Sequence, residues 1–384
     1  MSDVATPGVD AQLEDYRTEL TGFCYRMLGS AFEAEDAVQD TMVRAWRSQD
    51  RFEGRSSLRS WLYRIATNVC LDMLGSSKKR ARPMDFTDPK PLAQAQLNPH
   101  AEAVWLEPVP DGRVIGPAAD PAETAVARES VRLAFVAALQ HLPPKQRAVL
   151  ILREVLAWKA SEVAELLETS VASVNSALQR ARATLAESKT DGGDTVKPMD
   201  EEQQKLLERY VAAFEGYDMK ALTALLHEDA VLSMPPFDLW LVGPADITGF
   251  MLTHGAACNG SRMLATVANG TPAFAQYHPT PEGHFLPWAL QVIEISEGRI
   301  AHINTFLDTK RWFPLFDLPE RIEADGTPGP VAAPGGISGF EAAFAAAAAA
   351  GGAPGAGAPG AGAGAGAGDS AAAGGLEGEA DKSE

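Results

Sequence analysis

A long stretch without helical or strand periodicity divides this chain and limits what it can fold into. From residue 84 to about residue 121 the sequence is rich in proline and has no sustained apolar repeat. A stretch of roughly forty residues is far longer than an ordinary loop, so we expect it to be functional or mobile, with Trp105 as an anchor. With 384 residues, the chain should contain two or three domains. We therefore predict a multidomain protein in which residues 84–124 form an extended linker.

The net charge of −18 conceals opposite local charges. Residues 44–82 contain ten Lys and Arg against three Asp and Glu, a local charge of +7. Residues 200–384 contain nine basic and 24 acidic residues, a local charge of −15. Phosphate binding depends on the field at the contact, because counterions are released there, so the whole-chain charge does not exclude it. The 44–82 segment is the candidate nucleic-acid surface.

The cysteines and the apolar runs exclude other classes of protein. Cys24, Cys70 and Cys258 are scattered and form no CxxC or Cys–His pattern. This usage suits a reducing cytosol and argues against a disulfide framework or a zinc site. No apolar run approaches the length of a membrane span, and the first residues lack the features of a signal peptide. We expect a cytoplasmic protein with no membrane segment, metal or cofactor.

Residues 31–46 are predicted to form a helix with two different faces. Ser30 and Glu33 give a capping box at its start. An apolar stripe at helical spacing is expected to be buried: Ala34, Val38, Met42, Ala45 and Trp46. A second stripe lies on a different face: Asp36, Gln39, Asp40 and Val43. Most charged stripes are only solvated surface, and the alternative is a docking surface for a basic partner.

Two further helical regions follow the same period. Residues 57–74 are amphipathic, and a basic run with Lys78, Lys79, Arg80 and Arg82 comes directly after them. Beyond the linker, a helix over residues 159–168, a turn at residues 169–170 and a second helix from Val171 predict a helix-turn-helix. The second helix of that motif normally enters the major groove of DNA, although many helix pairs share this spacing.

The last part of the chain is expected to be an α+β domain over residues 201–320, joined by a short linker at residues 190–200. It begins with two helices that lead into a strand, and residues 284–308 are predicted to form a β-hairpin with the turn SEGR. Residues 321–384 become rich in alanine and glycine, have little to bury, and are expected to be a disordered tail.

The first two units together resemble the extracytoplasmic-function (ECF) sigma factors of bacterial RNA polymerase. The likeness lies in GSAFEAEDAVQDTMVRAW, in FEGRSSLRSWLYRIATNVCLDML with the basic run after it, and in LPPKQRAVLILREVLAWKASEVAELL with SVNSALQRARATL. Several linked matches in the right order are far more specific than a lone helix-turn-helix. The resemblance implies two all-α domains, sigma region 2 at residues 11–83 and sigma region 4 at residues 125–189.

The resemblance also implies the partners of these domains. Such proteins bind promoter DNA and core RNA polymerase, on the clamp of its largest subunit and the flap of its second largest. Carboxylates facing arginines give charge-assisted bonds and orientation, which suits the acidic stripe to the clamp. The residues implied to bind core polymerase are Asp36, Gln39, Asp40 and Val43.

The implied DNA-binding residues fall into two groups. Opening the minus-ten element requires capture of flipped bases by aromatic and amide groups, while cations hold the strand. This role falls to Trp61, Asn68, Asp72, Lys78, Lys79, Arg80 and Arg82, although Trp61 is equally well interpreted as a core residue. The minus-thirty-five element would be read by Ser173, Asn175, Ser176, Gln179, Arg180 and Arg182. Asn175 and Ala177 stand where many relatives carry cations, which predicts weaker non-specific affinity.

The α+β domain resembles the SnoaL-like branch of the cone-shaped fold. Such cones enclose a pocket, and some members are cyclases or isomerases that use an aspartate as a base. The candidate pocket residues are Asp238, Trp240, His254, His302 and Asp308. None of them forms an acid–base pair at diagnostic spacing, so we assign no catalytic residue and expect a regulatory appendage that could take a small-molecule ligand.

Three functions compete at this point. A helix-turn-helix regulator without core polymerase needs only the second unit, and a SnoaL-like cyclase or isomerase fused to a DNA-binding module needs mainly the third. A sigma factor uses the acidic stripe, the basic segment, the linker and the helix-turn-helix together. We therefore predict a sigma factor, not an enzyme, of the type with a C-terminal SnoaL-like domain that modulates its activity in a direction left open.

Overall fold

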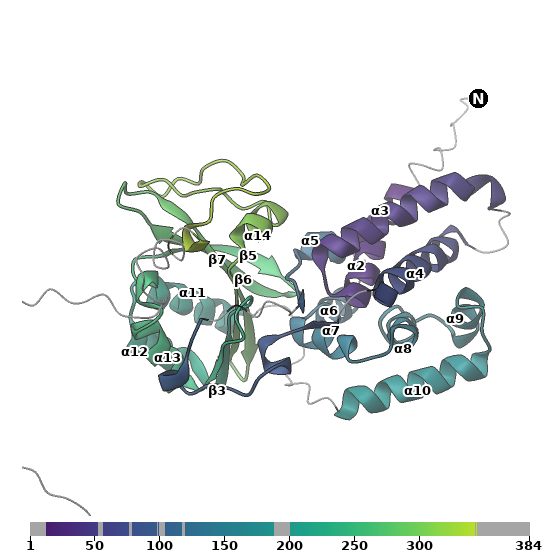
Figure 1. Ribbon diagram of the computed structural model, residues 1–384, viewed down its shortest axis with the longest axis horizontal. Helices are drawn as coiled ribbons and strands as arrows, with labels where there is room; N and C mark the ends of the chain where they lie inside the picture. Colours follow the sequence, from purple (N-terminus) through teal and green to yellow (C-terminus); the bar gives the residue numbers. More distant parts are fainter. Residues whose placement is uncertain are drawn as a thin grey trace, which may run out of the picture.

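The computed structural model describes residues 13–52, 57–76, 79–97, 99, 104–116, 120–187, 200–341 and 343. In Figure 1 the helical units lie on the right and the α+β unit on the left, in direct contact. Among the described residues, no helix is long and apolar enough to cross a membrane.

The first helical unit packs three amphipathic helices together, α2 (Arg17–Leu28), α3 (Ala31–Ser48) and α4 (Leu58–Ser76). Ser30 caps α3, because its hydroxyl accepts a hydrogen bond from the Glu33 backbone N–H (3.1 Å). The apolar stripe on α3 is buried at Ala34, Val38 and Ala45 and partly buried at Met42.

The expectation that Trp46 is buried is wrong. This side chain is 55% exposed. Trp46 lies one turn beyond Val43 and two turns beyond Gln39, so the helix geometry groups it with the second, exposed stripe. A large apolar group therefore stands beside the acidic residues of α3.

The described residues of the linker, residues 84–124, contain only short pieces of regular structure and pack against the other units. A two-residue parallel bridge joins its β2 (Val104–Trp105) to β1 (Arg80–Ala81), just after the first helical unit. The 3-10 turn η2 (Pro83–Asp85) lies at the start of the linker and is followed by the 3-10 turn η3 (Leu92–Gln94). The short helix α5 (Asp111–Val114) comes after β2. Leu92 packs against Gly249 of the α+β unit. This linker is hereafter called the connector.

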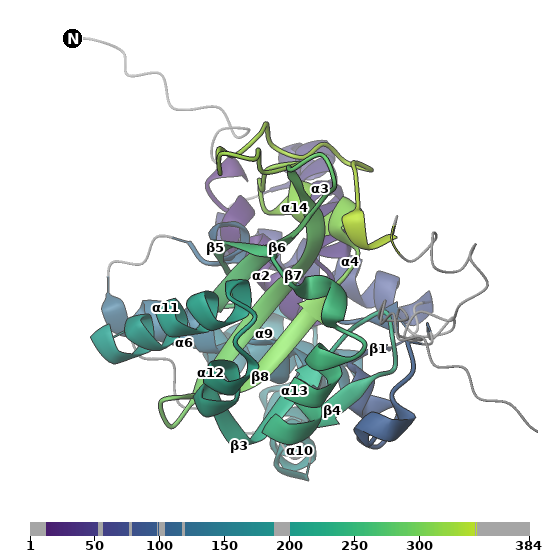
Figure 2. The ribbon, with the colours of Figure 1, turned by 90° about the vertical axis from the view of Figure 1, so that its left-hand side faces the viewer.

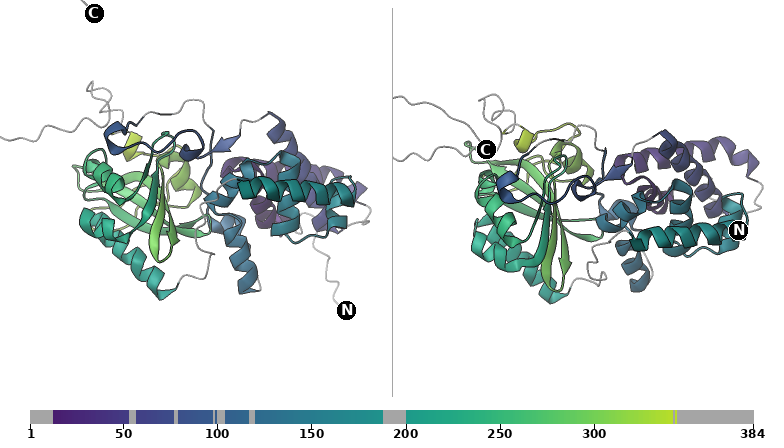
Figure 3. Two further views of the ribbon diagram at one scale, coloured as in Figure 1. Left: turned by 90° about the horizontal axis from the view of Figure 1, so that it is seen from below. Right: turned by 60° about the horizontal axis from the view of Figure 1, so that its bottom comes forward.

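The second helical unit contains the predicted helix-turn-helix. Its elements are α6 (Pro121–Glu129), α7 (Leu133–Gln140), α8 (Pro144–Leu150), the π-turn η4 (Ile151–Val155), α9 (Ala160–Leu166) and α10 (Val171–Glu187). Helices α9 and α10 meet across a tight turn, with Val163 and Leu166 buried against Val174 and Leu178, as the spacing predicts. Figure 3 shows α10, in teal, on the surface of the helical part.

The α+β unit is a six-stranded sheet in the order β4-β3-β8-β7-β6-β5, in which only β3 and β8 run parallel. The predicted hairpin of β7 and β8 is confirmed, with Gly298 in the left-handed conformation (φ 69°) at its turn. Helices α11, α12 and α13 lie over one face of the sheet (Figure 2). The elements are α11 (Glu201–Glu215), α12 (Met219–Leu225), β3 (Leu226–Ser233), β4 (Trp240–Val242), α13 (Pro244–Leu252), β5 (Arg262–Ala268), β6 (Thr271–Pro279), β7 (Phe285–Ser296), β8 (Arg299–Phe306) and α14 (Thr309–Leu315).

The two faces of this sheet belong to different hydrophobic cores. On β7, Ala289 and Ile293 belong to the core beneath α11 to α13. Leu290 and Val292 alternate with them and belong to the core that also contains α2, α4 and α8. Because one apolar core runs from the helices into the outer face of the sheet, the sigma-like helices and the α+β unit pack as one body.

The described structure continues past residue 320, where the sequence predicts the end of the α+β unit. Ile322 exchanges two backbone hydrogen bonds with Phe285 (2.7 and 2.9 Å). Further along, the Phe340 ring packs edge-on against Trp288, with centroids 5.3 Å apart. The segment is structured because it still carries large apolar side chains, such as Ile322 and Phe340, that pack against the domain. The alanine- and glycine-rich residues from 344 onward, part of the expected disordered tail, lie outside the described residues.

Candidate functional site

The second stripe of α3 lies on the surface of the molecule. Asp36 and Gln39 are exposed, and Asp40 is half-buried with an ion pair to Arg44 (2.8 Å). Val43 and Trp46 add apolar surface, at 39% and 55% exposed. We call Asp36, Gln39, Asp40, Val43 and Trp46 the docking face. Exposed carboxylates beside an exposed tryptophan suit a partner that offers both cations and apolar contacts.

Helix α4 presents a polar edge next to the docking face. Asn68 and Asp72 are exposed one turn apart, and Asp72 lies 3.5 Å from Arg44 of α3. Trp61 is half-buried, and its ring packs on the Phe52 ring with centroids 5.0 Å apart. In this arrangement Trp61 packs against the core of the first helical unit. The neighbouring Tyr63 is fully buried between Phe23 and Trp158.

The basic run does not form one surface. Lys78 lies outside the described residues. Lys79 is exposed, with its Nζ 2.9 Å from Nδ1 of His141. Arg82 is bound to Asp85 (3.6 Å).

Arg80 points into the protein. It is 9% exposed and forms ion pairs with Glu33 (2.7 Å) and Glu107 (3.4 Å). The same Glu107 oxygen binds Arg311 of α14 (2.8 Å), while its other oxygen accepts a hydrogen bond from Ser30 (2.5 Å). One buried carboxylate from the connector thus holds together the first helical unit and the α+β unit.

The second helix of the helix-turn-helix is open to solvent on its polar side. The residues predicted to read DNA are all exposed on α10: Ser173, Asn175, Ser176, Gln179, Arg180 and Arg182. Arg182 forms a 2.6 Å ion pair with Glu154, and Ser173 lies 2.9 Å from the Ser170 hydroxyl at the start of the helix. Nothing in the described part of the chain covers this face.

The two helical units pack directly on each other. The Arg59 guanidinium of α4 lies over the Trp158 ring (5.4 Å) of the second unit. Buried Arg147 of α8 donates hydrogen bonds to the Met27 carbonyl of α2 and to the side chain of Gln140. Helices α8 and α9 therefore cover one side of α4, the helix predicted to contact opened DNA.

A single side chain of the α+β unit joins three other segments. Asn269, in the β5–β6 turn, is fully buried and has a left-handed backbone (φ 54°). Its amide nitrogen donates to the Tyr25 hydroxyl (2.7 Å) and the Val131 carbonyl (2.8 Å), and its oxygen accepts from the Val109 N–H (3.0 Å). These partners lie on α2, between α6 and α7, and in the connector. We call Asn269 and these partners, with the ion pair described next, the junction.

A buried ion pair supports the same contact. Arg132 and Glu294 lie 2.8 Å apart, and each side chain is 5% exposed. Burial alone would raise the pKa of Glu294, but His302 and Arg132 outweigh it and lower that pKa. The carboxylate is therefore ionised at neutral pH. Removal of either partner would break the shortest ion pair of this buried cluster, which also includes Glu129 at 3.7 Å from Arg132.

The predicted pocket residues of the α+β unit do not come together. Asp238 binds Lys90 (3.0 Å) and Trp240 donates to the Thr87 carbonyl (2.8 Å), so both hold the connector. His302 lies on the outer face of the sheet opposite Glu294, because Ile303 and Thr305 take the inner positions of β8. Asp308 lines a separate hollow of about 350 Å³ beside Arg311.

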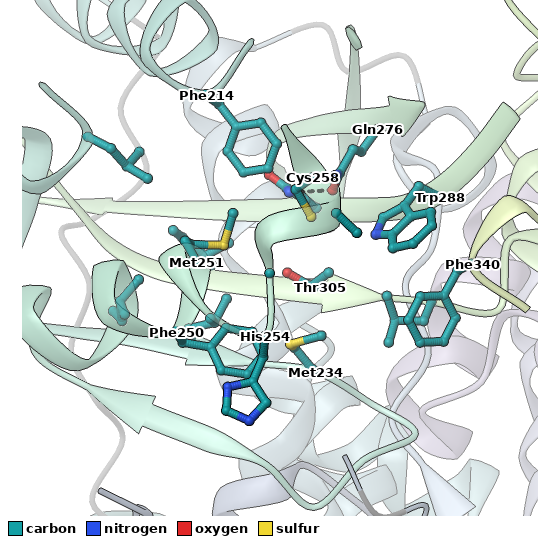
Figure 4. A pocket seen from close by; sticks show the side chains of 18 of the residues that line it. Phe214, Met234, Phe250, Met251, His254, Cys258, Gln276, Trp288, Thr305 and Phe340 are labelled. Atoms are coloured by element: carbon teal, nitrogen blue, oxygen red, sulfur yellow. Dashed lines mark hydrogen bonds between the residues drawn. The ribbon is translucent and has the colours of Figure 1, made fainter. Parts of the chain in front are cut away.

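Only His254 of that set lines the cavity inside the cone, where its ring stacks on Phe250 (5.2 Å between centroids). In Figure 4 the cavity is bordered mainly by apolar side chains. Among the described residues, no group of three or more His, Cys, Asp or Glu could hold a metal ion.

Three parts of the chain match known protein families. Residues 13–80 match Sigma-70 region 2, residues 132–185 match Sigma-70 region 4, and residues 207–303 match the SnoaL-like domain. The chain is 45% identical over 315 residues to the ECF RNA polymerase sigma factor SigG of Mycobacterium tuberculosis, which covers 81% of this chain and 84% of SigG. The chain belongs to the ECF sigma factors.

Among ECF sigma factors it resembles those with a C-terminal SnoaL-like domain. SigJ of Mycobacterium tuberculosis is 28% identical over 304 residues, 76% of this chain and 89% of SigJ. The crystal structure of SigJ matches 77% of this chain and 95% of its own chain, with a TM-score of 0.50 and 23% identity, which supports the shared fold. The predicted family and fold class are confirmed. The relatives are sigma factors, not enzymes, and an ECF sigma factor acts with core RNA polymerase on promoter DNA.

Sequence reasoning missed the residues that join the domains of this sigma factor. Asn269 and Gly270 form the dipeptide Asn-Gly, a strong signal for a two-residue hairpin turn, but nothing in the sequence predicts its distant partners. Trp46 could have been placed on the exposed face by continuing the stripe through Gln39 and Val43. Arg132 and Glu294 carry no local signal.

Proposed function

We propose that this sigma factor docks on core RNA polymerase through the exposed face of α3 while its SnoaL-like domain keeps regions 2 and 4 closed. The observation that carries this proposal is Asn269, which is bound to region 2, to the connector and to region 4 at once. It follows that the SnoaL-like domain modulates promoter binding by stabilising one arrangement of the two sigma regions. The site of action is the cytoplasm, where core polymerase and promoter DNA are found.

Size decides whether the closed arrangement suits promoter reading. The centres of the minus-ten and minus-thirty-five elements are about 25 base pairs apart, which is about 85 Å of duplex at 3.4 Å per pair. A compact body of roughly 180 residues is only about 40 Å across. The two regions in direct contact are therefore too close to read both elements. Promoter recognition requires that the contact between α4 and helices α8 and α9 opens.

Opening the junction would also release residues predicted to bind DNA. Arg80 is held by Glu107, and Glu107 is in turn held by Arg311 of the SnoaL-like domain. Loss of the Arg311 contact removes one of the bonds that keep this cluster buried. We propose that Arg80 then joins Lys79, Asn68 and Asp72 on the surface that captures the opened minus-ten strand.

The docking face needs no such release. Asp36, Gln39, Val43 and Trp46 are exposed in the closed arrangement. Core polymerase can therefore engage α3 first, and the energy of further contacts with region 4 can then be used to separate the two regions. The modulating domain acts on the second step and leaves the first unchanged.

Transcription with purified core polymerase tests this proposal. Full-length wild type, Asn269→Ala and the control Asn259→Ala, an exposed asparagine of the same domain, would be compared in run-off assays on promoter fragments that the wild type transcribes. Asn269→Ala should bind core as well as wild type does but give severalfold more open complex, measured by permanganate reactivity of promoter thymines. Equal open-complex yield from all three proteins would refute the gating role.

Deletion of the whole SnoaL-like domain is a weaker test. The outer face of its sheet carries Ala275, Tyr277 and Leu290 in the same core as α2 and α8. Truncation near residue 189 would expose that core to water and destabilise the two regions for reasons unrelated to gating. Point substitutions at the junction avoid this ambiguity.

The alternative function, a DNA-binding regulator that acts without core polymerase, predicts a different result for the docking face. A helix-turn-helix regulator would retain its full effect when Asp36 and Asp40 are reversed in charge, because it has no need of the docking face. Loss of run-off transcription with retained binding of duplex DNA by region 4 supports the sigma mechanism.

A further inference from the structure

The SnoaL-like domain encloses a cavity with no lining residue from region 2 or region 4. It has a volume of about 60 Å³ and lies between α11 to α13 and the inner face of the sheet (Figure 4). No Asp, Glu, Lys or Arg is among its lining residues. Burial raises the pKa of the Cys258 thiol to about 11, so this group is neutral near pH 7. The lining is therefore largely apolar, with the His254 ring at one side.

The polar groups of the lining are few and ordered. Tyr210 donates to Gln291 (2.6 Å), Gln291 donates to Gln276 (2.9 Å), and Gln276 donates to Ser261 (3.1 Å). This chain fixes the glutamine side chains and satisfies them. In Figure 4 the Thr305 hydroxyl points into the space that remains, so it can bind a polar atom of an occupant.

Two residues from outside the cone fold complete the wall. Phe340 comes from the C-terminal segment, where its ring packs on Trp288 and on Phe237 (5.3 and 6.1 Å between centroids). Leu97 comes from the connector between regions 2 and 4. Neither residue belongs to the sheet or to its three helices. A ligand could therefore displace these side chains from the cavity without disrupting the cone.

We propose that this cavity is a binding site for an uncharged, largely apolar small molecule with one hydrogen-bonding group. In the absence of the ligand, the Phe340 side chain fills part of the space that the ligand would take. An apolar cavity of about 150 Å³ binds benzene, so a space of about 60 Å³ is too small for an aromatic ring. Withdrawal of the Phe340 side chain supplies the missing volume and opens a path to solvent. The ring of the ligand then takes over the contact with Trp288.

Ligand binding would be coupled to the sigma regions through Leu97. The connector is held on the cone by Lys90 with Asp238, by Thr87 with Trp240, and by Leu97 in the cavity wall. A ligand that touches Leu97 adds buried contact to this docked connector, and by reciprocity a docked connector raises ligand affinity. This coupling rests on the proposed gating, whereas the binding site itself does not.

Binding of N-phenyl-1-naphthylamine, an uncharged fluorescent probe with one N–H, tests the site in the full-length protein without polymerase. Phe340→Ala should bind the probe at least about tenfold more tightly than wild type, which is about 1.4 kcal/mol. Phe340→Leu should give an intermediate gain. Ile337→Ala, on the same segment but exposed, should match wild type. In the Phe340→Ala background, Ala257→Trp places a bulky side chain at the lining and should return the affinity to the wild-type level.

Two results would overturn the site. One is a folded Phe340→Ala or Phe340→Leu protein that binds the probe no better than wild type. The other is a gain that survives Ala257→Trp, because the probe then binds elsewhere. Hydrogen exchange tests the coupling separately: saturating probe should slow exchange of amides in residues 92–97 of Phe340→Ala, and unchanged exchange would refute the coupling while the binding result stands.

Discussion

The docking face and the junction are both contact surfaces, but they are built in opposite ways. The docking face lies on one helix, with Asp36, Gln39 and Val43 brought together by helical spacing alone. The junction brings Asn269 to Tyr25 and to Val131, which are 244 and 138 residues away along the chain. The first surface is exposed and ready to bind, whereas the second is buried and already bound.

The two surfaces should also respond differently to substitution. A surface formed by a single exposed helix can be altered with little effect on stability, because its side chains contact mainly water. A junction made of buried polar groups is sensitive to every partner, since each unpaired group costs its desolvation energy. Under the proposed function, the sigma factor would bind polymerase through a surface that tolerates substitution and would hold regions 2 and 4 through one that does not.

The comparison is tested most strongly by removing the charge of Glu294. Glu294→Ala removes the buried partner at 2.8 Å from Arg132 and leaves the more exposed Glu129 at 3.7 Å, so we expect the free energy of unfolding to fall by about 3–5 kcal/mol. Urea denaturation of the full-length protein measures the change. Affinity of the remaining folded protein for core polymerase should equal that of wild type. A loss below about 1 kcal/mol would mean that the ion pair does not hold the junction.

Backbone packing at the junction gives a matched pair of glycine variants. Gly270 (φ 73°) follows Asn269, and an added Cβ would lie 2.5 Å from the Arg128 carbonyl oxygen. Gly298 (φ 69°) has nothing within 4 Å. Gly298→Ala should cost about 1–2 kcal/mol for the left-handed backbone, and Gly270→Ala about 2–5 kcal/mol, because overpacking adds to that strain. Equal losses in thermal unfolding would show that the β5–β6 turn does not approach region 4 closely.

Charge reversal on the docking face should give the opposite pattern. The double variant Asp36→Lys, Asp40→Lys should weaken core binding by about 10- to 100-fold, or about 1.4–2.8 kcal/mol. Its unfolding free energy should stay within about 0.5 kcal/mol of wild type, because both side chains are at the surface. Titration with labelled sigma factor measures the first, and urea denaturation the second. Co-purification with core at the wild-type level would show that α3 is not the docking helix.

Acid provides the mildest test, because it acts only on the ionised form of Glu294. The folded pKa of this carboxyl is lowered, so its contribution to stability is complete above the ordinary glutamate range and is lost as pH falls through the folded pKa. Below about pH 4.5 the stability difference between wild type and Glu294→Gln should shrink. A difference that stays constant down to pH 3 would contradict the assignment of an ionised pair.

Much of the fold could be predicted from local patterns. Ser30 as the cap of α3, the turn between α9 and α10, and the β7–β8 hairpin at Gly298 all depend on residues close in sequence. The docking face followed from the same helical period, and only Trp46 was assigned to the wrong side of it. The site inside the SnoaL-like domain could not be predicted in this way, because side-chain chemistry favours polar residues such as Asp238 but does not indicate which face of the domain they occupy.

The face of each strand depends on register and bulges. The β7–β8 ladder shifts between Glu294 and Ile295, and a shift of one residue moves every following side chain to the other side of the sheet. The shift brings Ile300 into the inner core. Glu294 and His302 pair before it on the outer face, where Glu294 binds Arg132, while Thr305 lies on the opposite face of β8 and lines the cavity.

The sequence by itself determined the helices, the helix-turn-helix, the docking stripe and the family, because these depend on spacings within one or two turns of chain. Only the tertiary structure decided that Arg80 is buried against Glu107, that Asn269 joins three segments, and that Phe340 and Leu97 close the cavity. Such contacts join residues tens to hundreds of positions apart, and their energy comes from desolvation in a shared core. No local pattern records which distant group will fill a given buried position.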